Sequence, residues 1–190
     1  MKPNLRPCFG LAAALVVSGI TVADAAESDP IRTAGEFLRI ALPLAAGGIS
    51  LGKHDQHGIV QLGGSEILAE GSSLLLEELI EEERPDKSDR YSFPSDSAAV
   101  TFSAASFLQI RYGWRYGLPA YAVAGFVGWS RVKSQRHYWH DVLAGAALGW
   151  VASEITASRY HNVPGSNGAS APLPAAFAHG PLGFSFAAHW

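Results

Sequence analysis

The sequence has little of several residue types, and each scarcity excludes a class of protein. Cys8 is the only cysteine among 190 residues, so the chain has no disulfide framework and packing must hold the fold. Basic residues are also fewer than acidic ones, with 14 Lys and Arg against 17 Asp and Glu and a net charge of -3. This acidic balance argues against nucleic acid as a partner.

Long charge-free stretches are missing from the segments that are predicted to be helical. The longest, residues 97–110 and 116–130, are shorter than the ~20 apolar residues that span a bilayer. The mean hydropathy of +0.10 is low for a bundle surrounded by lipid. A membrane-associated or marginally inserted protein and one that is free of the membrane therefore both stay open.

The N-terminus has the pattern of a secretory signal peptide. Lys2 and Arg6 precede an apolar run at 11–20, and residues 23–25 form an A-x-A cleavage site. We therefore predict that residues 1–25 are removed and that the mature protein lies in the periplasm of a bacterium or on the periplasmic side of its inner membrane. An uncleaved membrane anchor is the alternative, which the short apolar run disfavours.

Apolar periodicity after the signal peptide predicts an all-α fold, a bundle of five to six helices. The helices are predicted at residues 33–52, 58–83, 95–110, 118–129 and 137–156. Small residues recur along them, and Gly145 and Gly149 form a G-x-x-x-G face that lets another helix approach closely. The helical domain is predicted to cover residues 26–161, and residues 162–190 a linker and a C-terminal tail, either irregular or a short hairpin.

One polar cluster has residue types that bind metals. His54, Asp55 and His57 lie between the first two predicted helices, but no further ligands follow at helical or strand spacing. A solvated loop is therefore favoured over a metal site, and we predict neither a metal nor a cofactor.

The stretch from Ser130 to Asp141 has the clearest chemistry, because Arg131, His137 and Asp141 stand at spacings that suit attack on a phosphate. Residues 137 and 141 are one helical turn apart. A helix that begins near His137 would place the carboxylate beside the imidazole. The carboxylate would then hold one ring nitrogen and leave the other free as a nucleophile or base.

Two further segments precede this stretch, Arg84-Pro85 at the end of a predicted helix and residues 94–97, Pro-Ser-Asp-Ser, at the start of another. Together the three segments resemble the type 2 phosphatidic acid phosphatase and vanadium haloperoxidase superfamily. Its motifs read K-x6-R-P, P-S-G-H and S-R-x5-H-x3-D. The resemblance covers residues 77–141, and the third motif is complete.

The resemblance implies a helical bundle that hydrolyses phosphomonoesters, with lipid phosphates among the candidate substrates. Carried over to this sequence, it makes His137 the nucleophile that forms a phosphohistidine and Asp141 the residue that orients it. Arg84 and Arg131 would hold the phosphoryl oxygens. Ser95 would lie at a helix N-terminus whose free N–H groups face the anion.

The first two motifs depart from the family pattern. Glu77 stands where the family has Lys, and Asp96 and Ser97 stand where it has Gly-His. Losing the general acid typically costs about 10²- to 10⁴-fold in rate. Exchanging a cation for an anion near a phosphate costs up to ~8 kcal/mol if Glu77 points inward, counting roughly 4 kcal/mol for each unit charge at about 4 Å. In the alternative, Glu77 belongs to a solvated acidic face and Arg84 forms ion pairs.

Asp96 has two interpretations. It is either a carboxylate that caps the helix N-terminus, or a buried acid with a raised pKa that replaces the missing His. The sequence thus favours two functions, an exported phosphatase impaired by these replacements, and a non-catalytic relative that binds an anionic headgroup or a protein partner. A vanadium haloperoxidase ranks third, because the missing Lys and His would hold and protonate vanadate.

Overall fold

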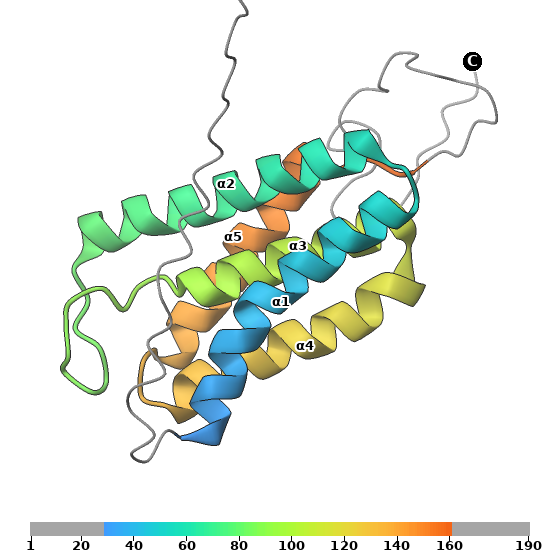
Figure 1. Ribbon diagram of the computed structural model, residues 1–190. Coiled ribbons are helices and arrows are strands. Elements are labelled where there is room, and N and C mark those ends of the chain that lie inside the picture. The colour runs from blue at the N-terminus through green and yellow to red at the C-terminus, as the bar shows by residue number, and fades with distance from the viewer. Residues whose placement is uncertain (1–28, 161–190) are drawn as a thin grey trace, which may run out of the picture.

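The computed structural model describes residues 29–160, which form an up-and-down bundle of five helices (Figure 1). The helices are α1 Pro30–Gly52, α2 Gln56–Ile80, α3 Asp96–Tyr112, α4 Trp114–Lys133 and α5 Trp139–Thr156. Residues 29–160 contain no strand, so the predicted all-α fold is confirmed. The predicted signal peptide and the predicted linker and tail lie outside the described residues.

Helix α3 is the centre of the bundle, because it contacts each of the other four helices. It is buried nearly all round, which explains why its sequence shows little amphipathic periodicity. Phe107 and Leu108 of α3 pack in the main core against residues of α1, α2 and α4, among them Leu42, Leu62 and Ala124. The buried small residues of α3 let these neighbours approach its backbone.

The G-x-x-x-G face of α5 packs against α3, as predicted. A Cβ at Gly145 would collide with the carbonyl oxygen of Ser95, and one at Gly149 with the carbonyl oxygen of Ala99. Because both obstacles are backbone atoms, neither can move aside without shifting a helix. This contact fixes α5, and with it the segment that precedes α5, against the N-terminal end of α3.

We expect Gly149→Ala to lower the free energy of unfolding by about 1 to 3 kcal/mol, since overpacking a tight contact costs that much. Gly63→Ala on α2 is the matched control, because a Cβ there meets nothing within 4 Å. The control should be about 1 kcal/mol more stable than wild type or unchanged, since alanine favours helix. Equal thermal stability of the two variants would contradict the close contact between α3 and α5.

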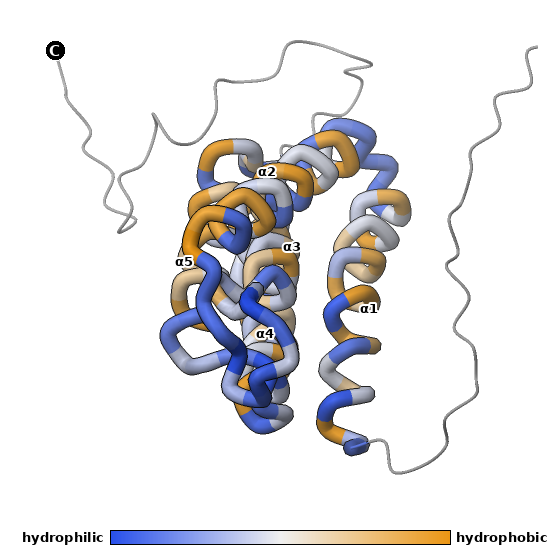
Figure 2. The backbone as a smooth tube through the Cα atoms, turned by 90° about the vertical axis from the view of Figure 1, so that its left-hand side faces the viewer, coloured by the Kyte–Doolittle hydropathy of each residue, from blue (hydrophilic) through white to orange (hydrophobic). Residues whose placement is uncertain are grey.

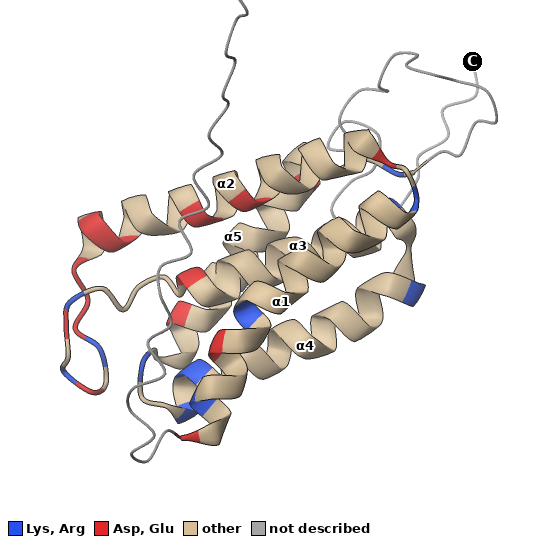
Figure 3. Cartoon of the chain, viewed as in Figure 1, with Lys and Arg blue, Asp and Glu red and all other residues tan. Residues whose placement is uncertain are grey.

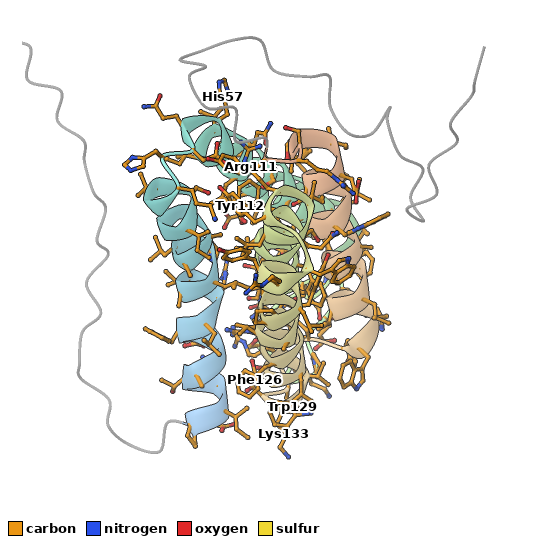
Figure 4. All side chains as sticks on the ribbon, turned by 90° about the vertical axis from the view of Figure 1, so that its right-hand side faces the viewer. His57, Arg111, Tyr112, Phe126, Trp129 and Lys133 are labelled. Carbon is orange, nitrogen blue, oxygen red and sulfur yellow. The ribbon has the colours of Figure 1, made fainter. Side chains whose placement is uncertain are left out.

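The predicted solvated loop between the first two helices is wrong for Asp55, which is buried. Its side chain accepts a hydrogen bond from Gly58 N at 2.9 Å and forms an ion pair with Arg111 at 2.5 Å. Tyr112 Oη also donates to it at 2.7 Å. His54 and His57 are exposed, and Figure 4 shows His57 at the same end of the bundle as Arg111 and Tyr112. Asp55 therefore ties the start of α2 to the end of α3.

Large apolar side chains stay exposed on the outer helices. They include Phe37, Ile40, Leu44 and Leu51 of α1, and Val60, Ile67, Leu75 and Leu79 of α2. Helix α1, at one edge of the bundle (Figure 2), is long and apolar enough to cross a membrane by length and composition alone. One such helix near an N-terminus is weak support for a membrane span. Charged residues are concentrated in the loop from α2 to α3 and near several helix ends, and α2 also carries acidic residues along its middle (Figure 3).

Candidate active site

A cavity of about 660 Å³ lies where α1, α2 and α3 meet the turn between α4 and α5. Arg84, Arg131 and His137 come from three different segments of the chain, and all three line it. Its other polar lining residues are Glu36, Arg39, Glu66, Glu70, Asp96, Ser97 and Arg136, and its apolar ones are Ile40, Pro43, Leu44 and Val100. The structure thus brings the two predicted phosphate-binding arginines and the predicted nucleophile to one pocket.

His137 is buried, with 3% of its surface exposed, and it lies just before α5 rather than on it. Its Nδ1 is 2.8 Å from the carbonyl oxygen of Ser92, which can only accept a hydrogen bond. Nδ1 therefore carries the proton, and Nε2 is the nitrogen with a free lone pair. Burial lowers the pKa of His137, so the ring is neutral at neutral pH. A neutral imidazole with a free Nε2 is what nucleophilic attack requires.

The Asp141 carboxylate lies beside the His137 ring as predicted, with Oδ2 3.8 Å from Nδ1, but at this distance it does not hold that nitrogen by a hydrogen bond. The helix begins at Trp139, two residues later than predicted, so Asp141 is in its first turn. From there its carboxylate folds back and accepts from Tyr138 N at 2.8 Å, as acidic residues at this position commonly do. It also accepts from the hydroxyl of Ser92 at 2.5 Å.

Ser92 connects the two predicted catalytic residues, although no sequence pattern singles it out. It is fully buried in the loop between α2 and α3. Its carbonyl oxygen holds His137 while its hydroxyl donates to Asp141. Asp141 therefore acts on the imidazole through Ser92, and a serine in a polar loop has no periodicity or motif that would reveal such a contact.

Arg131 lies in the last turn of α4 and is 6% exposed. Its Nη1 is 3.6 Å from Glu36, but its Nε and Nη2 have no hydrogen-bond partner within residues 29–160. Buried donors are normally satisfied, so a buried guanidinium with unused N–H groups beside a cavity is suited to an anionic ligand. Arg84 is more engaged, with Nε 2.8 Å from Asp89 and both Nε and Nη2 3.2 Å from the carbonyl oxygen of Tyr91.

Ser95 is buried and caps α3, with its hydroxyl accepting from Ala98 N at 3.4 Å. It does not line the cavity. The neighbouring residues of the second motif, Asp96 and Ser97, do line it. The N-terminal end of α3 therefore faces the cavity as predicted, but through the residues that follow Ser95.

Asp96 is an ionised carboxylate rather than an acid. Burial alone would raise its pKa, but the charge of Arg39 and the hydrogen bonds from Ser97 outweigh burial and hold the pKa below its ordinary value. Arg39 Nη2 is 2.7 Å from Asp96 Oδ2, and the hydroxyl of Ser97 donates to Oδ1 at 3.1 Å. The hypothesis that Asp96 replaces the missing His as a general acid is therefore wrong.

Glu77 is half-buried, unlike the exposed Glu78, Glu81 and Glu83, and it is not among the described residues that line the cavity. Burial, and next the charge of Asp96, raise its pKa to about 7. The alternative of a solvated acidic face is therefore wrong for Glu77 itself. At neutral pH this carboxyl is close to half ionised, so it opposes an anion in the cavity less than a fully charged glutamate would.

Two further cavity residues were missed by sequence reasoning because they lie on α1 and α2, outside all three motifs. Arg39 pairs with Asp96 and is also 3.4 Å from Glu70. Burial raises the pKa of Glu66 to about 8, and both of its carboxyl oxygens are buried without a hydrogen-bond partner in the part of the chain that the structure describes. Only the packing of α1 and α2 against α3 places these side chains in the cavity.

Beside the cavity, Glu82, His140 and Asp141 have ligand atoms within 4.8 Å of one another and are the described residues that could hold a metal ion. His140 Nε2 is 2.8 Å from Glu82 Oε1 and 2.8 Å from Asp141 Oδ1. A histidine between two carboxylates satisfies this geometry by itself, without an ion.

Comparisons with known proteins agree with this arrangement. The model of the PAP2 superfamily matches residues 63–163, more than half of the chain. The chain is 30% identical over 137 residues to the lipid A 4'-phosphatase of Helicobacter pylori, covering 66% of this chain and 69% of that protein. It is 40% identical over 75 residues to the lipid A 1-phosphatase of Porphyromonas gingivalis, 38% of this chain but only 17% of that protein. The crystal structure of Aquifex aeolicus LpxE shares the fold, with a TM-score of 0.51 at 17% identity over 66% of this chain and 91% of that one.

Proposed function

Because the chain belongs to the PAP2 superfamily, we propose that it is a phosphatase that removes a phosphate group from a lipid through a phosphohistidine on His137. The observation that carries the proposal is the buried, neutral imidazole with a free Nε2 in the cavity that Arg131 lines with unpartnered N–H groups. A nucleophile and a cation that face the same space suit attack on a phosphoryl group.

In the proposed reaction, Nε2 of His137 attacks phosphorus while the phosphorus–oxygen ester bond breaks. The lipid oxygen leaves with the bonding electrons and takes a proton from water, because Ser97 stands where the family has its acid. A second water then attacks the phosphohistidine, and inorganic phosphate and free imidazole result. Arg84 and Arg131 hold the phosphoryl oxygens, and Ser92 and Asp141 keep the ring oriented while it carries positive charge.

A lipid substrate is supported by the relatives and by the lining of the cavity. Two relatives are lipid A phosphatases. Ile40, Pro43, Leu44 and Val100 give the cavity an apolar side, and two of them, Ile40 and Leu44, are also among the exposed apolar residues of α1. Such a surface suits the acyl part of a phosphorylated lipid. We place the domain, residues 26–161 after signal cleavage, at the periplasmic side of the inner membrane.

Release of inorganic phosphate from phosphorylated lipids by the purified protein tests this proposal. The panel contains phosphatidate and lipid A, with a soluble phosphomonoester for comparison. Steady release from at least one lipid is the expected result, at a rate reduced by the absent general acid by about 10²- to 10⁴-fold relative to intact family members. No release above a protein-free blank would overturn it.

A non-catalytic protein that binds an anionic headgroup is the second candidate. It is favoured because an ionised Asp96 and a half-buried Glu77 stand at positions where the family has Gly and Lys. This candidate predicts that the protein binds inorganic phosphate or a phosphorylated lipid without releasing phosphate. Turnover in the assay above would eliminate it.

The raised pKa of Glu77 predicts a pH effect on phosphate binding. Below pH 7 the carboxyl is mostly protonated and neutral, whereas above pH 7 it becomes an anion that repels phosphate. Wild-type protein should therefore lose more affinity for inorganic phosphate between pH 6 and pH 8 than Glu77→Gln, by roughly 10-fold, which corresponds to about 1.4 kcal/mol of repulsion between the two charges. Phosphate itself also titrates between these pH values, but this affects both proteins equally and does not contribute to the difference between them.

Calorimetric dissociation constants of both proteins at the two pH values measure this difference. Glu78→Gln is the control, since Glu78 is exposed on the next position of the same helix and should behave as wild type. Identical pH dependence of wild type and Glu77→Gln would show that Glu77 does not face the anion site.

A further inference from the structure

Arg39 places a third guanidinium in the cavity, from a helix that carries none of the phosphatase motifs. It lies on α1, which ends before the region matched by the superfamily model begins. Its Nη2 is 2.7 Å from Asp96 Oδ2, and Asp96 is the first residue of α3. The same cavity is lined by Arg131 and His137. A cation from outside the motifs therefore stands in the site where the first motif lacks its lysine.

We propose that Arg39 is a phosphate-binding residue that takes the place of the missing lysine, and that Asp96 occupies Arg39 until a phosphoryl group displaces it. This inference rests on the proposed phosphatase function. The Asp96 carboxylate already has the contacts an anion would seek, because it accepts from Arg39 and from the amide and hydroxyl of Ser97 at the start of α3. A phosphoryl oxygen makes the same type of charge-assisted contact with a guanidinium.

The packing of α1 holds Arg39 in this position. One turn before it, a Cβ at Gly35 would collide with the side chain of Ser130, the residue that precedes Arg131. Gly35 and Arg39 are four residues apart and share a helix face. The absence of a side chain at Gly35 thus lets α1 approach the end of α4, and Arg39 and Arg131 line the cavity from neighbouring helices. Among the described residues, Arg131 pairs with Glu36 at 3.6 Å and keeps Nε and Nη2 without partners, whereas Arg39 pairs with Asp96 at 2.7 Å and more loosely with Glu70 at 3.4 Å.

Calorimetric binding of inorganic phosphate to the full chain tests the inference. Arg39→Ala should weaken binding by roughly 10- to 100-fold, the range for a charged hydrogen bond. Asp96→Asn, which removes the competing charge and keeps the shape, should strengthen binding by about 10-fold. In the Arg39→Ala background Asp96→Asn should have a much smaller effect, since it acts by freeing Arg39. Arg115→Ala is the control, because Arg115 is exposed and sixteen positions before Arg131, about 24 Å along α4.

Tighter binding by Asp96→Asn cannot come from a misfolded protein, but loss of a repelling charge would also produce it, so the gain is compared with and without Arg39, and Arg39→Gln replaces Arg39→Ala if the alanine variant is unstable. Unchanged affinity in Arg39→Ala, or an equal gain from Asp96→Asn with and without Arg39, would overturn the inference. Failure of the phosphatase proposal is distinguishable, because it appears as absent turnover in wild type, whereas these binding constants need no turnover. If wild type turns over and Arg39→Ala keeps its KM, the function stands and the role of Arg39 is refuted.

Discussion

Replacement of His137 by alanine is expected to reduce phosphate release at least about 10⁴-fold, the largest effect of any single substitution in this chain. The variant removes the only attacking atom of the proposed reaction, Nε2. His137 is buried, the pKa of its ring is lowered, and its Nδ1 is held by the carbonyl oxygen of Ser92. Together these features keep Nε2 neutral and directed away from the loop. Arg84 and Arg131 remain, so binding of inorganic phosphate should change far less than turnover.

The control for this variant is His57→Ala, since His57 is exposed at the end of the bundle where Arg111 and Tyr112 lie (Figure 4). It should keep wild-type activity. Both variants are assayed for phosphate release and for binding of inorganic phosphate. Full activity in His137→Ala would show that His137 is not the nucleophile.

Restoring the family pattern with Glu77→Lys, Asp96→Gly and Ser97→His is expected to raise kcat/KM by about 10²- to 10⁴-fold or more. The histidine supplies the general acid for the leaving oxygen. The lysine replaces the half-buried carboxyl of Glu77 with a cation, and the glycine removes the Asp96 carboxylate that pairs with Arg39. The gain should appear in both kcat and KM, because one change acts on bond breaking and two act on the binding of the anion.

Glu78→Lys is the matched control for the charge change, because Glu78 is exposed and adjacent to Glu77. It should leave kcat/KM within about 3-fold, as expected for an exposed charge screened by solvent. A triple variant that folds but gains no activity would mean that positions 77 and 97 no longer face the reacting phosphate.

The sequence was sufficient for features that depend on local spacing. The apolar and small-residue patterns predicted an all-α bundle, and the G-x-x-x-G pattern predicted the close contact that Gly145 and Gly149 make with α3. The three motif segments predicted that Arg84, Arg131 and His137 converge, and these residues line one cavity. Their chemical roles stay predictions until the assays above are made.

Features that depend on packing between distant segments were not predictable from the pattern. Ser92 contacts His137 and Asp141 only because the loop between α2 and α3 folds onto the start of α5. Arg39 reaches Asp96 across 57 positions of sequence through the packing of α1. Spacing alone also placed His137 inside α5, although the folded-back carboxylate of Asp141 lets the helix begin two residues later. Each of these contacts requires knowledge of which elements are neighbours.

The central claim is that a phosphoryl group is transferred to His137 within this cavity, and trapping the intermediate tests it most directly. The protein is mixed with a phosphorylated lipid substrate, quenched in alkali within a single turnover and digested for mass spectrometry. We expect one phosphate on the peptide that contains His137, stable in alkali, lost in acid and absent from His137→Ala. Turnover that proceeds with no phosphate on His137, or with phosphate on a different residue, would contradict it.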